Sequence, residues 1–406
     1  MVIRTSGSNP LPSCKGLTAA DEVAALLDVK ALLNRAGPSS IAGLSTWANG
    51  TDPCEWAGIS CSNKTAVTGL NLTAIDISLP GDSKLTLLAL LAAIRNVTQL
   101  QSLVLSGVGI RGALETPNEP GLDTFLSLRH LDLSHNPGIT AGLPSSWYVL
   151  FKLQTLDISH TGVTGPLPTA YAALQQLREF RAANCTGISG QLPAAWGLLN
   201  LEFLEITNSG LTGGLPSAWA DANVLQQSRT SFIAALRNRT TAVTKAADDL
   251  AAGAAAAATQ PAVDQPGPLG LLHLRVLGLS VTEPGRGGLA GSLPGSFAAM
   301  TQLQVLMLAG HSFNGTLPPS WTRLQKLRVL DLSHNSLSGN LPSWYVSMRK
   351  LAVLKVQDNR LVPSGSSSWE FYEYLLAGGT QLQCLCVAGN VGELVDAAAA
   401  ARLQGL

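Results

Sequence analysis

The chain has 406 residues and no formal net charge, because 26 Lys and Arg balance 26 Asp and Glu, and charged residues are only 13% of the total. Such a chain lacks the basic surface that binds a phosphate backbone, which argues against a nucleic-acid partner. The longest apolar runs, 85–94 and 250–258, are shorter than the roughly 20 residues that cross a bilayer, so no membrane span is expected.

The amino-terminal part predicts a flexible tail followed by a helical cap. Residues 1–16 include no continuous apolar stretch and do not read as a secretory signal peptide. Residues 17–66 begin with Thr18 at a capping-box spacing, followed by an apolar stripe at helical spacing over 18–33. The segment "DPCEWAGISC" then places Cys54 and Cys61 around a tryptophan.

A leucine pattern repeats over residues 67–216 and again over 274–390. Its frame is L-x-x-L-x-L-x-x-N, followed by G-x-L-P and an aromatic residue, and the leading leucines recur every 24 residues at Leu303, Leu327 and Leu351. Many copies in phase at this period are the signature of leucine-rich repeats. The alternating L-x-L segment predicts one short parallel strand per repeat, with its leucines in the core.

The ninth position of each repeat predicts a ladder of buried polar side chains. The turn after each strand leaves backbone groups that need hydrogen-bond partners, and an asparagine amide both donates and accepts. Cys185 stands at this position, so we expect a buried structural residue and not a reactive thiol. The predicted ladder consists of Asn136, Thr161, Cys185, Ser209, Thr282, Asn335, Asn359 and Asn390.

An aromatic residue recurs three positions after each Leu-Pro pair. Such a column could bind sugars, but its repetition at one phase favours packing on the convex side. The column consists of Trp147, Tyr171, Trp196, Trp219, Phe297, Trp321 and Tyr345.

The L-x-G-x-L-P frame and the paired cap cysteines resemble the plant-type leucine-rich repeat family. This family includes the ectodomains of receptor-like kinases and receptor-like proteins, and the polygalacturonase-inhibiting proteins. The resemblance implies an α/β solenoid, a horseshoe or superhelix with strands on its concave face, and a Cys54–Cys61 disulfide in the cap. It also implies a protein, peptide or glycan ligand, a candidate co-receptor, and no cofactor or metal. The kinase motifs are absent from this sequence.

Residues 217–273 interrupt the repeat with an alanine-rich stretch and a Pro/Gly-rich linker. Some ectodomains of the resembled family carry a folded island that helps to bind ligand. Few large apolar residues are present here, so a mobile helix with a disordered linker is the favoured reading.

The carboxyl-terminal end carries two cysteines on one predicted strand. Cys384 and Cys386 are two positions apart, and such side chains stand about 7 Å apart in a regular strand, beyond disulfide reach. We therefore expect free thiols there, and residues 391–406 to form a carboxyl-terminal end or cap. The tail cysteine Cys14 has no predicted partner.

Solvent-facing strand residues on the concave side are the candidate binding surface. The set is acidic in the amino-terminal half and apolar in the other half, where exposed Val and Met favour a protein or peptide partner. The alternative is that β-branched residues only suit strands. The candidates are His130, Asp132, Asp157, Glu179, Arg181, Phe203, Glu205, Val305, Met307, Val329, Asp331, Val353 and Lys355.

The motif "LDLSHN" brings together the residue types of a nucleophilic triad, but we do not expect catalysis from it. Asp331, Ser333 and His334 share one short extended segment, in which three side chains do not converge on one reacting atom. We predict no catalytic residue and no metal site, and hence a non-catalytic recognition module.

The compartment clues conflict. The cap cysteines and several N-glycosylation sequons favour an extracellular or cell-surface location. The missing signal sequence leaves a second hypothesis, an intracellular scaffold of the cytoplasm or cytoskeleton, including the ciliary axoneme. The sequons are at Asn49, Asn63, Asn71, Asn96, Asn184, Asn238 and Asn314.

Overall fold

The structure is a computed structural model of the chain. It describes residues 19–37, 41–63, 66–73, 85–116, 121–221, 270–282, 288–341, 347–362 and 382–391.

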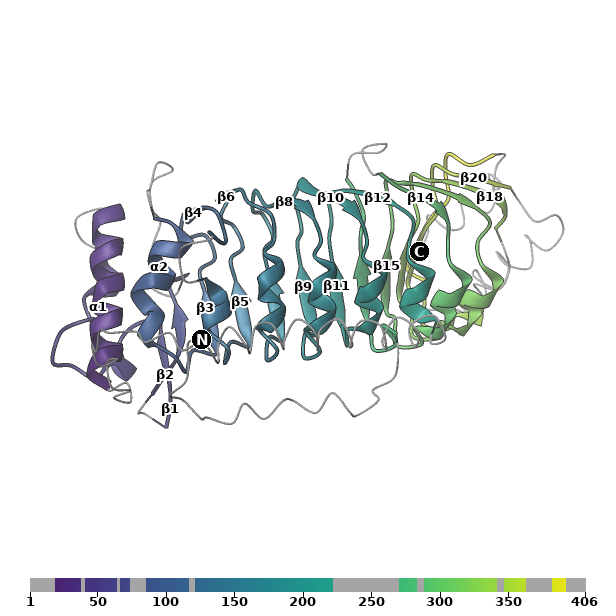
Figure 1. Cartoon of the computed structure of the whole chain (residues 1–406). Helices are drawn as coiled ribbons and strands as arrows, with labels where there is room; N and C mark the ends of the chain where they lie inside the picture. Colours follow the sequence, from purple (N-terminus) through teal and green to yellow (C-terminus); the bar gives the residue numbers. More distant parts are fainter. Residues whose placement is uncertain are drawn as a thin grey trace, which may run out of the picture.

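The described residues form an elongated solenoid built on a 12-stranded sheet (Figure 1). One short strand per repeat joins this sheet, and every pairing is parallel except that of β1 with β2. The arrangement confirms the predicted leucine-rich repeat solenoid, with its strands on the concave face. In sheet order the strands are β1 (Ile59–Ser62), β2 (Ala66–Asn71), β3 (Ser102–Val104), β5 (His130–Asp132), β7 (Thr155–Asp157), β9 (Glu179–Arg181), β11 (Phe203–Glu205), β13 (Val276–Gly278), β15 (Val305–Met307), β17 (Val329–Asp331), β19 (Val353–Lys355) and β21 (Cys384–Cys386).

A second, outer sheet was not expected from the sequence. It forms where each repeat continues past its ladder position, so that the L-x-G segments of neighbouring repeats pair in parallel. The glycine of this segment has positive φ, for example +82° at Gly165 and +80° at Gly339, a conformation that side chains disfavour. Its strands are β8 (Thr164–Pro166), β10 (Gly187–Gln191), β12 (Gly210–Gly213), β14 (Gly288–Ser292), β16 (Ser312–Gly315), β18 (Ser336–Asn340) and β20 (Arg360–Val362), while β4 (Arg111–Gly112) pairs with β6 (Gly138–Ile139).

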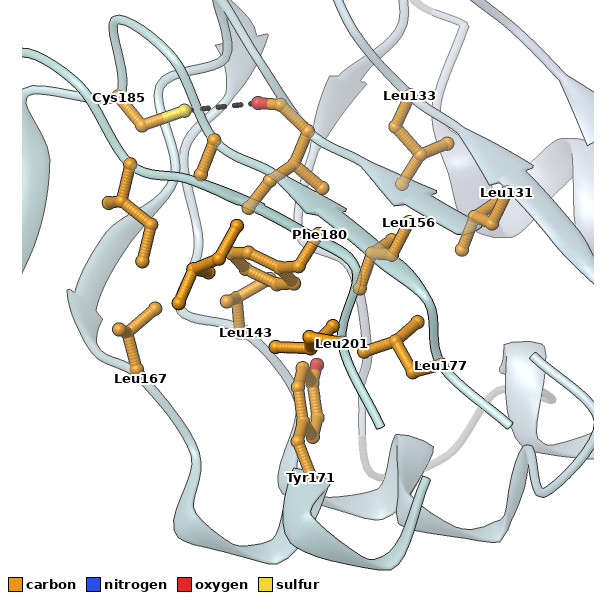
Figure 2. Close-up of a cluster of buried hydrophobic side chains, with 14 of the residues drawn as sticks. Leu131, Leu133, Leu143, Leu156, Leu167, Tyr171, Leu177, Phe180, Cys185 and Leu201 are labelled. Atoms are coloured by element: carbon orange, nitrogen blue, oxygen red, sulfur yellow. Dashed lines mark hydrogen bonds between the residues drawn. The ribbon is translucent and has the colours of Figure 1, made fainter. Parts of the chain in front are cut away.

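Short 3-10 helices follow the Leu-Pro pairs. The proline caps each helix and the aromatic side chain turns inward, so that Trp147, Tyr171, Trp196, Trp219, Phe297 and Trp321 are each at most 1% exposed. Figure 2 shows Tyr171 among the leucines and Phe180 of successive repeats. The column is therefore core and offers no sugar platform, although Tyr345 lies outside the described residues. These helices are η6 (Ser145–Val149), η7 (Thr169–Ala173), η8 (Ala194–Leu198), η9 (Ser217–Ala220), η10 (Gly295–Ala299) and η11 (Pro319–Arg323); η5 (Leu122–Thr124) belongs to an earlier repeat.

The amino-terminal cap covers the open end of the solenoid. Helix α1 (Ala19–Ala36) buries Leu26, Val29 and Leu33, while Thr18 lies outside the described residues. A second helix, α2 (Leu87–Ala93), continues into η4 (Ile94–Asn96) and buries most of the 85–94 apolar run. The cap also contains η1 (Ala42–Leu44) and η2 (Pro53–Glu55).

A disulfide and a tryptophan pair hold the cap together. Cys54 and Cys61 are bonded, with Cα atoms 5.6 Å apart, as predicted from the family resemblance. Trp47 stacks on Trp56 at 5.5 Å and donates its indole N–H to the Ala57 carbonyl at 2.8 Å. The cap thereby replaces the neighbour that an end repeat lacks.

Removal of this disulfide is expected to destabilise the cap. The variant Cys54→Ser should lower the free energy of unfolding by about 2–3 kcal/mol, the effect of freeing a short closed loop in the unfolded chain. Urea denaturation followed by circular dichroism measures the change. Cys384→Ser, which alters a half-buried free thiol, is the control. Equal effects of the two substitutions would contradict the expectation.

The flanks of residues 222–269 meet within one repeat. Strand β11 pairs directly with β13, and the Leu271 amide donates to the Trp219 carbonyl at 2.7 Å. Both side chains are fully buried, so the core continues across this point. The helix and linker predicted between the flanks lie outside the described residues.

Candidate binding face

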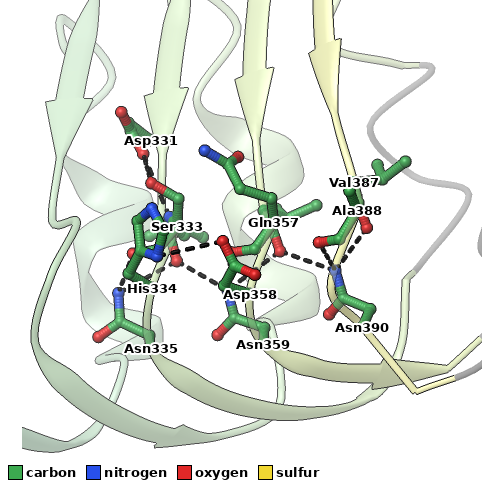
Figure 3. Close-up of polar contacts among 12 residues, drawn as sticks. Asp331, Ser333, His334, Asn335, Gln357, Asp358, Asn359, Val387, Ala388 and Asn390 are labelled. Atoms are coloured by element: carbon green, nitrogen blue, oxygen red, sulfur yellow. Dashed lines mark hydrogen bonds and ion pairs between the residues drawn. The ribbon is translucent and has the colours of Figure 1, made fainter. Parts of the chain in front are cut away.

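A ladder of asparagine side chains fixes the ends of the strands (Figure 3). The Asn359 amide donates to the carbonyls of Leu332, Val356 and Gln357 at 2.9–3.2 Å and accepts from the Leu337 amide at 3.0 Å. Asn136, Asn335 and Asn390 make the corresponding bonds in their own repeats. Each asparagine thus joins two repeats and holds their strands in register.

Other residues at the predicted ladder position make fewer bonds. Thr161 donates to the Ile158 carbonyl at 2.6 Å, and Cys185 donates to the same carbonyl at 3.0 Å (Figure 2). Burial raises the pKa of the Cys185 thiol, which accords with a structural role. Ser209 is also buried.

Thr282 differs from its predicted place in the ladder. It is exposed, and both its amide and its hydroxyl donate to Asn208 Oδ1, at 2.8 and 3.0 Å. Its repeat is longer than the two that follow it, since Leu303 follows Leu274 by 29 residues instead of 24.

His311 occupies the ladder position of the next repeat and was not among the predicted ladder residues. Counting nine positions from Leu303 would have found it. Its Nε2 donates to the Leu279 carbonyl at 2.7 Å, whereas its Nδ1 is buried without a hydrogen-bond partner. Burial lowers the pKa of His311 below the usual value of about 6.5 for a histidine.

The buried His311 should make stability fall in acid. Because its pKa is lowered in the folded state, its contribution is complete above about pH 6.5 and is lost as the pH falls toward the folded-state pKa. We expect His311→Asn, the residue that neighbouring repeats use, to lose less stability than the wild type between about pH 7.5 and about pH 5. Urea denaturation at both pH values measures this. Equal losses in both proteins would exclude His311 as a source of acid sensitivity.

Two rows of side chains face solvent on the 12-stranded sheet, because strand register aligns equivalent positions. The first row runs through Ser102, His130, Thr155, Glu179, Phe203, Val276, Val305, Val329, Val353 and Cys384. The second runs through Val104, Asp132, Asp157, Arg181, Glu205, Gly278, Met307, Asp331, Lys355 and Cys386. All 13 sequence candidates lie in these rows.

The carboxylates of the second row are partly held by their own strands. Asp132 Oδ1 accepts from the Ser134 amide and hydroxyl at 2.9 and 2.6 Å, and Asp331 makes the same pair of bonds with Ser333. The other Asp331 oxygen stands 3.6 Å from Lys355 Nζ. One oxygen of each of these two carboxylates is therefore held by its own strand, and the second oxygen of Asp331 faces Lys355.

Arg181 marks the boundary between the polar and apolar halves. Its guanidinium stacks over the Phe203 ring at 4.4 Å and pairs with Glu179 at 3.1 Å. These contacts restrict an otherwise long and mobile side chain. The guanidinium of Arg181 covers one face of the Phe203 ring, and Phe203 is followed in the first row by the valines of the next strands.

The apolar patch comprises the half-buried side chains of Phe203, Val276, Val305, Met307, Val329 and Val353. Four of these are valines that occupy the same position on adjacent strands. Gly278 has no side chain, and the Met307 side chain of the neighbouring strand covers it. A Cβ atom added to Gly278 would lie 3.2 Å from Met307 Cε. The patch is therefore continuous across β11 to β19.

The triad-like motif does not assemble into a reactive site. Ser333 donates to Asp331, but His334 turns away with φ +53° and its Nδ1 lies 3.1 Å from Asp358 Oδ2 in the next repeat (Figure 3). The histidine therefore cannot take the proton of Ser333 while Asp331 orients it. This geometry supports the prediction that the motif does not carry catalysis.

A polar rim, which was not predicted from the sequence, borders the concave face at the ends of the strands. His135 and His160 stack at 4.4 Å, and His160 Nε2 lies 3.3 Å from the Asn184 amide nitrogen. Asn208 bonds to Asn184 and accepts from Thr282. The rim residues precede the ladder position, and most have positive φ, which His, Asn and Gly adopt more readily than most other residues. The rim could have been predicted from the His and Asn residues that recur at the eighth position of the repeat frame.

The predicted glycosylation sites differ in exposure. Asn49, Asn63 and Asn314 are exposed, with Asn314 on the outer sheet, whereas Asn71 and Asn96 are half-buried. Asn184 is exposed but belongs to the rim, and Asn238 lies outside the described residues.

The described part of the chain contains neither a membrane-spanning helix nor a cluster of metal ligands. None of its helices has the length and apolarity to cross a membrane. Nor does it contain three or more His, Cys, Asp or Glu side chains placed to hold one metal ion.

Comparison with family models matches separate parts of the chain. Residues 19–62 match the leucine rich repeat N-terminal domain, and residues 126–142 and 301–361 match leucine rich repeats. The brassinosteroid LRR receptor kinase BRL3 of Oryza sativa subsp. japonica is 34% identical over 167 residues, which are 39% of this chain and 13% of the rice protein.

Solved structures share the fold at low identity. The ectodomain of the Arabidopsis receptor kinase HAESA, in complex with an IDA peptide hormone ligand, is 21% identical with a TM-score of 0.63, over 92% of this chain and 50% of that one. A plant ice-binding protein is 18% identical with a TM-score of 0.59, over 92% of this chain and 97% of that one. This chain thus spans half of the HAESA ectodomain and a small part of the rice kinase. The matches confirm the predicted resemblance to plant-type leucine-rich repeat proteins.

Proposed function

We propose that this leucine-rich repeat chain is a non-catalytic recognition module that binds a peptide or protein segment across its concave face. The apolar patch is the observation that carries the proposal. Its six side chains remain half-buried on a surface whose strands pair in register from β11 to β19. A partner that covers this patch would remove apolar surface from water with little reordering of the protein.

The polar, amino-terminal half of the concave face would orient the bound ligand. Asp132, Asp157, Glu179 and Glu205 face solvent there against one arginine, Arg181. The favoured ligand therefore combines an apolar stretch with Lys or Arg residues that reach the acidic half. Long-range attraction of this kind guides association more than it adds affinity.

The relatives support ligand binding on such a solenoid. The HAESA structures contain a peptide hormone, and one of them also contains the co-receptor SERK1. A co-receptor for this chain is part of the same proposal. The aromatic column is buried, which weighs against a glycan as the ligand.

A peptide display experiment tests the proposal. The full chain is used to select binders from a library of linear peptides, and the selected peptides are measured on the double variant Met307→Asp, Val329→Asp. We expect enrichment of apolar peptides with basic residues, and a loss of affinity of about tenfold or more in the double variant, because charge on the patch resists desolvation.

The matched control places the same charges elsewhere. Ser312→Asp and Asn314→Asp alter exposed residues of the outer-sheet strand β16, and the selected peptides should bind that variant as they bind the wild type. Equal binding to both double variants, with both folded, would remove the apolar patch as the ligand site.

We further propose an extracellular or cell-surface location, which the cap disulfide and the exposed sequons support. Treatment of the native protein with an N-glycanase should lower its mass. An unchanged mass together with reduced Cys54 and Cys61 would favour the intracellular scaffold instead.

A further inference from the structure

Two free thiols lie side by side at the carboxyl-terminal end of the concave face. Cys384 and Cys386 occupy β21 and end the first and second rows of solvent-facing side chains. Their sulfur atoms are 3.6 Å apart, because both side chains turn toward each other from the same face of the strand. Both residues are half-buried and can be reached from solvent.

We propose that Cys384 and Cys386 form a chelating site for one thiophilic divalent metal ion of the Zn²⁺ class. Two thiolates bound to a tetrahedral ion at about 2.3 Å stand about 3.8 Å apart, close to the separation of these two sulfurs. A linear two-coordinate ion would need about 4.6 Å at the same bond length. The two sulfurs can therefore occupy two corners of a tetrahedral coordination shell with little movement of their side chains.

Metal binding at this pair depends on pH. Binding converts two thiols to thiolates and releases two protons, so the apparent affinity rises with pH. Burial, followed by the hydrogen bond that the Cys386 thiol makes to Cys384 and by the negative charge of a Cys384 thiolate, raises the pKa of Cys386; the charge of Lys355 lowers it and that of Asp331 raises it. Lys355 is the register partner of Cys386 on β19, so its charge stands beside the thiolate that would form.

The site would be open. Two thiolates fill half of a tetrahedral shell, and the remaining positions face solvent beside Val353, at the end of the apolar patch. Water occupies these positions in the free protein, and a donor group from a bound partner can replace it. The chelate thus presents an ion on the same face as the patch, without needing a partner in order to form.

Titration of the full chain with Cd²⁺, with the Cys54–Cys61 disulfide left intact, tests the site, since thiolate ligands produce the ultraviolet charge-transfer band of cadmium. We expect one Cd²⁺ per chain, competition by Zn²⁺, and proton release during binding. Cys384→Val continues the valine row and Cys386→Ser is nearly isosteric, so both variants should fold while binding about tenfold or more weakly.

Two controls separate this site from other thiols. Cys14→Ser and Cys185→Ser should leave the titration unchanged, because Cys185 is buried and bonded in the ladder. A cadmium band that survives in Cys384→Val would overturn the proposal, as would native protein in which Cys384 and Cys386 are already joined as a disulfide. Folding of each variant is checked by circular dichroism.

Discussion

Replacing Asn359 by alanine is expected to lower the free energy of unfolding by about 3 kcal/mol or more. The substitution leaves three carbonyls and one backbone amide without the partner that Asn359 supplies, in a position that is 6% exposed. The loss falls on the contact between two repeats, on which a solenoid depends for stability. Urea denaturation followed by circular dichroism measures the effect.

Two further variants distinguish ladder bonding from a general effect of substitution. Asn359→Asp keeps the shape but faces the three carbonyls with an acceptor, and it should destabilise at least as much as alanine. Asn200→Ala removes an asparagine with one exposed hydrogen bond, to the Gln175 carbonyl, and should cost less than about 1 kcal/mol. Similar losses for Asn200→Ala and Asn359→Ala would show that the ladder has no special role.

Truncation of the aromatic column is expected to have a comparable or larger effect. Trp196 is fully buried, packs edge-on against Phe180 at 5.0 Å, and donates its indole N–H to the Pro168 carbonyl of the preceding repeat at 3.0 Å. Trp196→Ala should therefore lower the free energy of unfolding by about 3–5 kcal/mol, from lost burial and the cavity left behind. The same denaturation measurement applies.

The intermediate variant Trp196→Phe separates packing from hydrogen bonding. It keeps an aromatic ring but leaves the Pro168 carbonyl without its donor, so its cost should be smaller than that of alanine. Leu126→Ala, at a side chain that is 57% exposed, is the surface control and should change stability by less than about 0.5 kcal/mol. A Trp196→Ala variant as stable as Leu126→Ala would contradict the core assignment of the column.

The repeat frame predicted the features that each repeat determines by itself. The period-two leucines fixed which side of each strand faces the core, and Leu131, Leu156 and Leu330 are indeed buried. The cap disulfide followed from the resemblance carried by Cys54 and Cys61.

Features that depend on neighbouring repeats were harder to predict. The outer sheet is built from glycine-containing segments with little strand propensity of their own, and they become strands only when stacked. Thr282 lies outside the ladder in a repeat that has extra residues, and His311 entered it without an amide group. The residues of the two solvent-facing rows could be predicted from the sequence. The stacking of Arg181 on Phe203 and the close approach of the Cys384 and Cys386 sulfurs could not, because they depend on side-chain rotamers that a repeat pattern does not determine.

The contact between Leu271 and Trp219 continues the solenoid across the segment of the chain that connects these two residues. Their backbone hydrogen bond and buried side chains close the repeat from both sides of residues 222–269. The entropy of closing a loop between two fixed points rises slowly with loop length, by only about 0.6 kcal/mol for each doubling. We therefore expect a change in length between residues 221 and 270 to alter the stability of the flanking repeats little, so this region can vary in length without disturbing the sheet that carries the proposed binding face.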